Sequence, residues 1–346
     1  MNLLIVRLGA LGDIVHAVPA AAALRRAFPD ARIDWLVDAR HRELLTLVPV
    51  IDRIVALERS SIGGWLDAAR QLRPARYDAA LDLQGLLKSA VLARASGAKR
   101  VVGFSIWHLR EKTASPFYSE AIDTTTTGAL SGHVIRKNLR LLRAFDIEDE
   151  RIEFPLSPVR SAAAEAVREQ AAGAPVALIN PGAAWPNKRW SAERFGEAAV
   201  FLRDVRGYAS FVLWGPGEEG LARAVADASD HAARVAPATR LPDLVELCRG
   251  ASLMVSGDTG PLHIAAAVGT PIVSLFGPTD PNRNGPWIEA DIAISRHASC
   301  ACHYERRCHR PDWCLNSISV AEVTAAIQVR TQNAPLRTRH PDTGRR

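Results

Sequence analysis

The amino-acid sequence predicts an α/β protein of two domains, each a parallel sheet with helices on both faces. Short, continuous apolar runs alternate with helical patterns along most of the chain, and such runs are typical of buried parallel strands. The prolines at positions 155 and 158 interrupt this alternation and indicate a linker. The length of 346 residues also favours two domains over one. We therefore expect a first domain over 1–157 and a second over 158–328.

Composition and charge are those of an ordinary soluble chain. Apolar residues make up 48% and charged residues 23% of the sequence. The net charge of +6 would suit an anionic partner, but much of the excess lies near the C-terminus and decides little. The apolar start is interrupted by Arg7 and followed by Asp13, so it is too short and too polar for a signal peptide or a membrane span. With five cysteines, an odd number, we expect a reduced, cytoplasmic protein.

The order of the elements follows from these runs. In the first domain, strands are expected at 2–8, 31–37, 53–57, 79–83 and 100–104. The first strand ends in a glycine turn, after which Asp13 opens a helix that runs to about residue 28 with a kink near Pro19. In the second domain, strands are expected at 176–179, 211–214, 253–256 and 272–276, with helices at 162–172 and 241–249. Residues from 329 onward are polar and are predicted to be disordered.

A basic helix is expected near the end of the first domain, over 133–145. Spacings of three and four place most of its cations on one face. One interpretation is a solvated basic face, which is the usual outcome, and the other is an electropositive wall for an acidic substrate. The residues concerned are His133, Arg136, Lys137, Arg140 and Arg143.

The stretch 255–271 combines a strand end, a tight turn and a buried helix. Asp258 and Thr259 are good N-cap residues, and Gly260 leaves the turn with little side-chain bulk. Free N–H groups at such a helix start attract anions and suit a diphosphate. The alternative is an ordinary turn between a strand and a helix. A second small-residue turn, 277–281, follows the next strand and favours the ligand site, because ligands bind at the carboxyl ends of parallel strands.

Two further side chains follow strands of the second domain. Lys188 lies on the loop after 176–179, where a lysine can neutralise charge that builds on a departing phosphate. Glu219 follows 211–214, where a carboxylate can accept hydrogen bonds from ribose hydroxyls. The alternatives are a solvated loop cation and an ordinary acidic residue at a helix N-terminus.

The glycine turn of the first domain has two other interpretations. A dinucleotide site would use Asp38 as the ribose acid, but the glycines do not stand at the three required positions. In addition, Asp13 would compete with a pyrophosphate at the helix start. A carboxylate in this turn suits a general base, and its plain alternative is an N-cap aspartate.

Four cysteines lie close together near the end of the second domain. Cys300, Cys302, Cys308 and Cys314 follow the pattern C-x-C-x5-C-x5-C. Four thiols could hold a zinc ion, but zinc knuckles use C-x2-4-C pairs, which this pattern lacks. The sequence therefore favours reduced thiols in a loop over a structural metal. Cys248, in an apolar helix, is expected in the core.

Several motifs, in the same order, resemble the lipopolysaccharide heptosyltransferases of glycosyltransferase family 9. They are residues 4–19, 82–90, 188–190, 256–263 and 276–281, and the similarity runs from residue 1 to about 328. Within the family, the heptosyltransferase I branch is the most similar because it has a comparable acceptor segment. The residues that carry this closer match are Trp107, Arg110, Phe117, Tyr118, His133 and Arg136.

The resemblance implies a glycosyltransferase-B fold, two Rossmann-like domains facing a cleft, with no metal and no cofactor. It implies an inverting transfer of L-glycero-D-manno-heptose from ADP-heptose to Kdo of Kdo-lipid A at the cytoplasmic face of the inner membrane, without a nucleic-acid partner. By position, Asp13 matches the catalytic base and Lys188 the lysine at the leaving phosphate. Donor-binding positions are matched by Lys188, Glu219, Asp258, Thr259, Gly260 and His263, and acceptor-binding positions by Arg110, His133, Arg136 and Lys137.

Two departures from the family pattern bear on the acceptor. The arginine cluster expected near 59–65 is thin, since Arg59 is followed by Ser60 and Ser61, and the cysteine-rich loop is not part of the heptosyltransferase I pattern. Heptosyltransferase II or another member with a different acceptor is therefore an alternative, and the oligomeric state stays open. Alternatives of other classes are a sugar-nucleotide epimerase of the same fold, a nicotinamide oxidoreductase and a non-catalytic nucleotide-binding protein.

Overall fold

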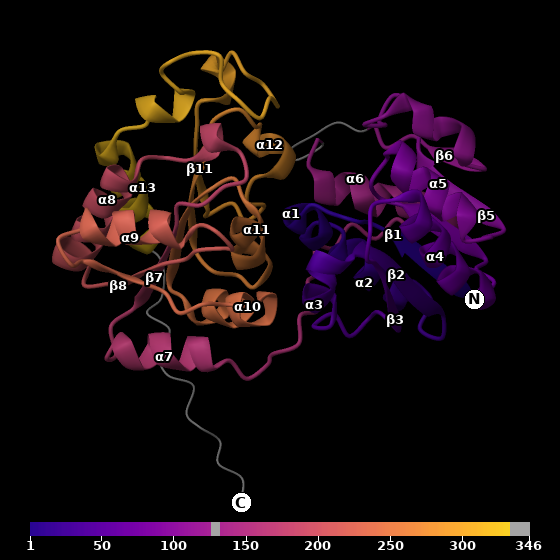
Figure 1. Cartoon of the computed structure of the whole chain (residues 1–346), viewed down its shortest axis with the longest axis horizontal. Helices are drawn as coiled ribbons and strands as arrows, with labels where there is room; N and C mark the ends of the chain where they lie inside the picture. Colours follow the sequence, from indigo (N-terminus) through magenta and orange to yellow (C-terminus); the bar gives the residue numbers. More distant parts are fainter. Residues whose placement is uncertain (126–131, 333–346) are drawn as a thin grey trace, which may run out of the picture. The chain divides into compact units, whose positions relative to one another are not determined.

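The computed structural model describes residues 1–125 and 132–332, which form two compact units (Figure 1). The first unit is built mainly from Met1–Val159, and the second begins at Arg160. Each unit contains one six-stranded sheet, and all the strand pairs within the two sheets are parallel. The α/β class and the two parallel sheets predicted from the alternating apolar runs are confirmed.

The strands occupy the buried apolar runs of the sequence. In the first sheet they are β1 (Asn2–Val6), β2 (Arg32–Asp38), β3 (Arg53–Leu57), β4 (Ala79–Asp82), β5 (Arg100–Phe104) and β6 (Glu120–Ile122). In the second sheet they are β7 (Val176–Asn180), β8 (Ala209–Val212), β9 (Ala233–Val235), β10 (Leu253–Gly257), β11 (Ile272–Phe276) and β12 (Ile292–Ser295).

Both sheets have the strand order of a dinucleotide-binding fold. The first runs β3-β2-β1-β4-β5-β6, and the second runs β12-β11-β10-β7-β8-β9. In each case the strand order reverses once, between β1 and β4 in the first sheet and between β7 and β10 in the second. Ligands of open parallel sheets bind at such a reversal, beyond the carboxyl ends of the strands. The topology alone therefore points to the loops after β1 and β4, and to those after β7 and β10.

Helices join the strands and cover the sheets. In the first part of the chain they are α1 (Leu11–Val15), α2 (Val18–Ala27), α3 (Arg42–Leu45), α4 (Ile62–Leu72), α5 (Leu87–Ala95) and α6 (Val134–Arg140). They are followed by α7 (Ala162–Gln170), α8 (Ala192–Arg206), α9 (Glu219–Asp227), α10 (Leu241–Gly250), α11 (Gly260–Ala267), α12 (Pro281–Asn284) and α13 (Val320–Gln332).

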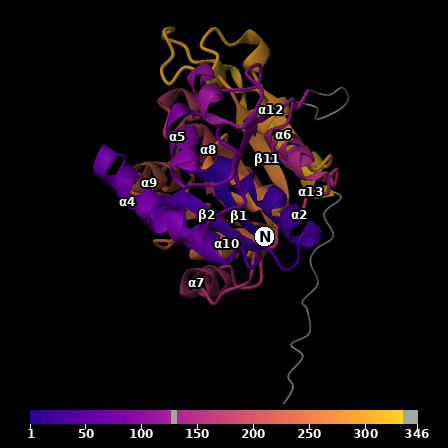
Figure 2. The ribbon, with the colours of Figure 1, turned by 90° about the vertical axis from the view of Figure 1, so that its right-hand side faces the viewer.

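The helices bury both faces of each sheet, which explains why the central strands are apolar throughout. In the first unit, α4 and α5 pack on one face and α2 lies on the other (Figure 2). In the second unit, α8, α9 and α13 pack on one face, while α10 and α11 lie on the other (Figure 1). Side chains of β1 from Leu3 to Val6 are fully buried, as a strand covered on both faces requires.

Two local predictions are wrong. The single helix expected from Asp13 to about residue 28 is two helices, α1 and α2, with a break at His16 and Ala17. Pro19 lies in the first turn of α2, where its missing N–H costs no helical hydrogen bond, so it starts a helix instead of kinking one. The disorder expected from 329 onward is wrong for residues 329–332, because α13 continues to Gln332; residues 333–346 lie outside the described part of the chain.

Candidate active site

The first candidate site residue, Asp13, lies in the first turn of α1, just beyond β1. Arg7 Nη2 lies 2.9 Å from Asp13 Oδ1, and Ala10 N donates to Asp13 Oδ2 at 3.2 Å. Ala10 occupies the N-cap position, so the interpretation of Asp13 as a plain N-cap is wrong. The side chain keeps 28% of its surface exposed. The carboxylate is thus held in one orientation and remains open to a substrate.

Arg7 connects Asp13 to the reversal of the first sheet. Its side chain is buried, and its Nη1 donates to the carbonyl oxygen of Leu83, directly after β4. The backbone N–H of Leu8 donates to Gln84 Oε1 at 2.8 Å, which ties the same two strand ends together. Asp13 is therefore placed at the position where the topology predicts a ligand.

A buried carboxylate supports the turn after β4. Asp82 accepts hydrogen bonds from Tyr118 Oη at 2.7 Å, Ser89 Oγ at 2.8 Å and Gln84 N at 2.9 Å. Burial raises the pKa of Asp82 above its usual range, although these donors oppose the shift. The ring of Tyr118 lies so close to Gly103 that a Cβ there would overlap it. The buried carboxylate of Asp82 therefore holds the turn after β4, which is the first part of the motif 82–90, in its conformation.

In the second unit, Lys188 and Asp258 form a buried ion pair beyond the ends of β7 and β10. Lys188 Nζ lies 2.5 Å from Asp258 Oδ2, and the two side chains are 15% and 3% exposed. Thr279 Oγ1 donates to the same carboxylate at 2.6 Å, and His263 Nε2 lies 3.4 Å from Oδ1. Burial alone would raise the pKa of Asp258, but His263 and Lys188 hold it well below its usual range. The carboxylate is therefore ionised and fixes the lysine beside α11.

The start of α11 has the features expected of an anion site. Thr259 is the N-cap residue, and its hydroxyl accepts a hydrogen bond from Asn180 Nδ2 at 2.8 Å instead of capping the helix. Gly260 and Pro261 begin the helix, so no Cβ beyond the proline ring crowds the first turn. Asn180 is the last residue of β7, and it therefore connects the two strand ends of this reversal. Thr259, Gly260, His263 and Lys188 lie together, as the donor-site interpretation requires.

The Lys188 loop packs tightly on β10. Lys188 Nζ lies 4.5 Å from the centre of the Trp185 ring, a cation–π contact. A Cβ on Gly257 would come within 2.7 Å of the carbonyl oxygen of Lys188, so only glycine allows this approach. These contacts place the ammonium group beside the N-terminus of α11.

The two adjacent acids after β8 have different surroundings. Glu219 is half exposed and pairs with Arg223 one turn along α9, at 2.5 Å. Glu218 accepts from Gly215 N at 3.2 Å and lies 3.7 Å from Arg189, on the loop of Lys188. Its carboxylate also lies so close to Gly182 that a Cβ there would overlap it. Sequence reasoning chose Glu219, but Glu218 is directed at the strand-end loops.

Most of the basic residues around α6 have protein partners. Arg136 Nη1 and Arg140 Nε bind the Glu150 carboxylate at 3.0 and 3.1 Å. His133 is fully buried, and its Nδ1 accepts from Ile135 N at the start of α6. These side chains hold α6 in place, so they do not form the continuous solvated face or the open wall that the spacing suggested.

Lys137 and Arg110, also in the first unit, have surroundings that differ from those of Arg136, Arg140 and His133. Lys137 Nζ donates to the carbonyl oxygen of His108 at 2.5 Å and lies 4.5 Å from the centre of the Phe104 ring. Burial lowers the pKa of Lys137 to about 8. Arg110 is exposed on the loop after β5, which also carries Trp107, 79% exposed.

Comparison with known proteins identifies the family. The model of glycosyltransferase family 9 (heptosyltransferase) matches residues 65–314. The chain belongs to this family. A lipopolysaccharide heptosyltransferase 1 from Pseudomonas aeruginosa is 30% identical over 322 residues, which cover 89% of this chain and 87% of that protein. The family resemblance inferred from the motifs is thereby confirmed, and the enzyme class is that of a heptosyltransferase.

Solved structures of heptosyltransferases have the same fold. The Escherichia coli heptosyltransferase WaaC with ADP-2-deoxy-2-fluoro heptose matches with a TM-score of 0.72 and 24% identity, over 95% of this chain and 99% of that one. The Escherichia coli ADP-heptose lps heptosyltransferase II matches with a TM-score of 0.75 and 22% identity, over 96% and 99%. The predicted glycosyltransferase-B fold is confirmed. Within the described residues, no helix is long and apolar enough to cross a membrane.

Proposed function

We propose that this heptosyltransferase transfers L-glycero-D-manno-heptose from ADP-heptose to Kdo of Kdo-lipid A, at the inner-membrane surface where such a lipid resides. The name of the Pseudomonas aeruginosa relative supports this acceptor class, and the ADP-2-deoxy-2-fluoro heptose in the WaaC structure supports the donor. The observation that carries the donor assignment is the buried Lys188–Asp258 pair at the open start of α11. We assign donor binding to the second unit and acceptor binding to the first.

The donor site is assembled to receive a diphosphate. The backbone N–H groups that begin α11 and the Lys188 ammonium provide positive charge, which stabilises negative charge on the departing phosphate. Asp258 keeps that ammonium in position, and Thr279 orients Asp258. Of the two acids after β8, we assign the ribose hydroxyls to Glu218, because its carboxylate already lies against the Lys188 loop while that of Glu219 is paired with Arg223.

We assign the general base to Asp13. In an inverting transfer, the acceptor hydroxyl oxygen bonds to the anomeric carbon as the bond from that carbon to the diphosphate oxygen breaks. The bonding electrons leave with ADP, and the hydroxyl proton passes to the Asp13 carboxylate. Arg7 supports this assignment, because it holds the carboxylate in one orientation at the reversal of the first sheet.

We propose a smaller set of acceptor-binding residues than the sequence suggests. Arg110 and Trp107 are both exposed on the loop after β5, and they offer a cation and an apolar ring to an anionic amphiphile. Arg136 and His133 are held within the first unit, so we assign them a supporting role at the acceptor site through the position of α6. We also assign Lys137 to the acceptor site, where its ammonium group packs against the ring of Phe104.

The test is to incubate the purified protein with ADP-heptose and Kdo-lipid A, and to measure released ADP and the mass of the lipid. The proposal predicts ADP release only with the acceptor present, and a lipid heavier by one heptosyl unit. Transfer only to a lipid that already carries a heptose would favour the heptosyltransferase II alternative. Conversion of the nucleotide sugar without any change in the lipid would favour an epimerase.

A further inference from the structure

The loop of residues 300–314, here called the cysteine loop, brings its four thiols together. Cys302 Sγ lies 3.2 Å from Cys308 Sγ, and the Cys314 thiol is a hydrogen-bonding neighbour of Cys300. Cys300, Cys308 and Cys314 line the same cavity. Cys300 and Cys302 are buried, and the other two are partly buried. The fifth cysteine, Cys248, lies in α10.

Two of the four sulfurs also accept a backbone hydrogen bond. The N–H group of Cys302 donates to Cys300 Sγ, and that of His309 donates to Cys302 Sγ, both at 3.4 Å. A neutral thiol is a weak acceptor, whereas an anionic acceptor strengthens such bonds. Donors of this kind orient the ligands of metal sites, so the two bonds to Cys300 and Cys302 favour thiolates at these positions.

The histidines of the loop have other partners. His303 Nε2 lies 2.7 Å from the carbonyl oxygen of His297, and His309 Nε2 lies 2.7 Å from Glu305 Oε2. The converging set is therefore made of sulfur alone. Arg194 and Arg310 line the same cavity as Cys300, Cys308 and Cys314, and their charges offset a site with more thiolates than a divalent ion can neutralise.

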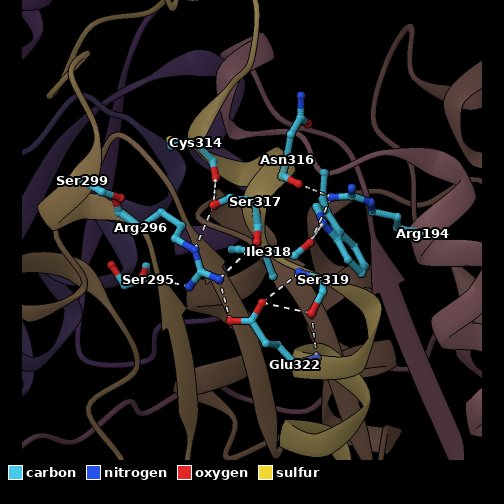
Figure 3. A network of polar contacts seen from close by, with 11 residues as sticks. Arg194, Ser295, Arg296, Ser299, Cys314, Asn316, Ser317, Ile318, Ser319 and Glu322 are labelled. Carbon is cyan, nitrogen blue, oxygen red and sulfur yellow. Dashed lines mark hydrogen bonds and ion pairs between the residues drawn. The ribbon is translucent and has the colours of Figure 1, made fainter.

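The end of the cysteine loop is fixed to the core of the second unit (Figure 3). The carbonyl oxygen of Cys314 accepts from Ser317 Oγ at 2.8 Å, and Ser317 Oγ accepts from Arg296 Nε at 2.9 Å. Arg296 Nη2 lies 2.5 Å from the Glu322 carboxylate on α13. This chain of contacts connects the backbone of Cys314 to α13, which packs on the sheet, and so anchors the C-terminal end of the cysteine loop.

The cysteine loop also contacts both turns that build the donor site. Asn187 Nδ2 donates to the carbonyl oxygen of Glu305 at 3.0 Å, and Tyr304 N donates to that of Pro278 at 3.0 Å. The first contact lies one residue before the donor-site lysine. The second lies one residue before the threonine that orients Asp258. The arrangement of this loop therefore affects the two turns that hold the diphosphate side of the donor.

We propose that the cysteine loop is a structural site for one tetrahedral, thiophilic metal ion, Zn²⁺, held by Cys300, Cys302, Cys308 and Cys314. No three His, Cys, Asp or Glu side chains among the described residues are already arranged around one ion. Zn–S bonds of ~2.3 Å place neighbouring sulfurs ~3.8 Å apart, so the Cys302–Cys308 pair opens by about half an ångström on binding. The thiols lose their protons as the Zn–S bonds form, so the affinity falls as pH is lowered.

The test measures metal in the full chain, without substrate. The protein is purified under reducing conditions with Zn²⁺ and dialysed, and its zinc content is determined by elemental analysis. We expect about one zinc per chain in the wild type and in the control Cys248→Ala, and background zinc in Cys302→Ser. Titration of the wild type with Co²⁺ gives a second readout that needs no variant: a tetrahedral thiolate site develops intense visible and near-ultraviolet absorption.

A consequence for the donor site follows and uses ADP alone as the probe. Chelation of the zinc is expected to weaken ADP binding several-fold, measured by calorimetry, and restored Zn²⁺ is expected to recover it. Wild type without stoichiometric zinc would overturn the proposal, as would zinc that is retained in Cys302→Ser or a Cys302–Cys308 disulfide found by mass spectrometry. Because zinc content is measured without sugar or lipid, failure here leaves the transferase assignment untouched.

Discussion

Replacement of Lys188 by methionine tests the donor site most sharply, because it removes the charge and keeps the length of the side chain. In the wild type, Lys188 Nζ lies 2.5 Å from Asp258, whose side chain is only 3% exposed. The variant leaves that carboxylate buried beside Thr279 and His263. Breaking one side of a buried ion pair costs about 3–5 kcal/mol. Lys188 is 15% exposed, and Thr279 and His263 still contact the carboxylate. We therefore expect the variant to lose about 3 kcal/mol of stability, the lower end of this range.

The same variant should lose catalysis beyond its loss of stability. Removal of one group that stabilises charge in a transition state lowers kcat by about 10²–10³-fold. ADP affinity should fall less, because the backbone N–H groups at the start of α11 remain. The assay combines denaturant unfolding, ADP calorimetry and ADP release from ADP-heptose at a temperature where the variant is folded.

The double variant Lys188→Met with Asp258→Asn provides the matched control. Because it removes both charges, its loss of stability should be smaller than the sum of the losses in the two single variants. We expect a difference of at least about 1 kcal/mol. Lys99→Met, on the surface, should change stability by less than about 0.5 kcal/mol. Wild-type turnover and stability in Lys188→Met would refute the reasoning and make this lysine an ordinary loop cation.

Four further predictions concern single residues. Asp13→Asn should lower transfer by about 10²–10⁴-fold with ADP affinity unchanged; wild-type transfer by a variant that binds ADP normally would reduce the role of Asp13 to its contacts with Arg7 and Ala10. Arg110→Glu should raise the acceptor KM and weaken its dependence on salt, and an unchanged KM would remove this residue from the acceptor site. Glu218→Gln should weaken ADP binding more than Glu219→Gln does, and the opposite order would restore the choice made from sequence. The fold lowers the pKa of Asp258, so the ionised carboxylate contributes stability above about pH 4, and this contribution is lost as pH falls toward the folded pKa. The free energy of unfolding of Asp258→Asn, measured with denaturant, should therefore vary less than that of the wild type between about pH 5 and 2.

The central strands and their order along the chain could be predicted because burial on both faces makes them continuous apolar runs. Predicted 53–57 and 100–104 coincide with β3 and β5. The outer strands β6, β9 and β12 were missed, since they have only three or four residues and are partly exposed, which leaves no periodic signal. The predicted strand 211–214 begins two residues after β8 does, because the first two residues of β8, Ala209 and Ser210, are not strongly apolar.

At the site, residues close in sequence to a strand end could be predicted, and contacts across the fold could not. Asp258, Thr259 and Gly260 follow β10 directly, and the short loop between strand and helix determines where they lie. The choice between Glu218 and Glu219 depends on the residue at which α9 begins, because adjacent residues at a helix start point in different directions. The convergence of the cysteines depends on a loop with no regular spacing, and the pairing of α6 with Glu150 depends on a loop that follows the helix.

The account rests on transfer of a heptosyl unit from ADP-heptose to a Kdo-bearing lipid, and the mass of that lipid after reaction tests it most directly. The purified protein is incubated with ADP-heptose and Kdo-lipid A, and the lipid is analysed by mass spectrometry, with Asp13→Asn as the control. The account predicts a single new species heavier by one heptosyl unit, formed in step with free ADP and nearly absent in the variant. An unchanged lipid mass with wild-type protein that binds ADP would contradict it.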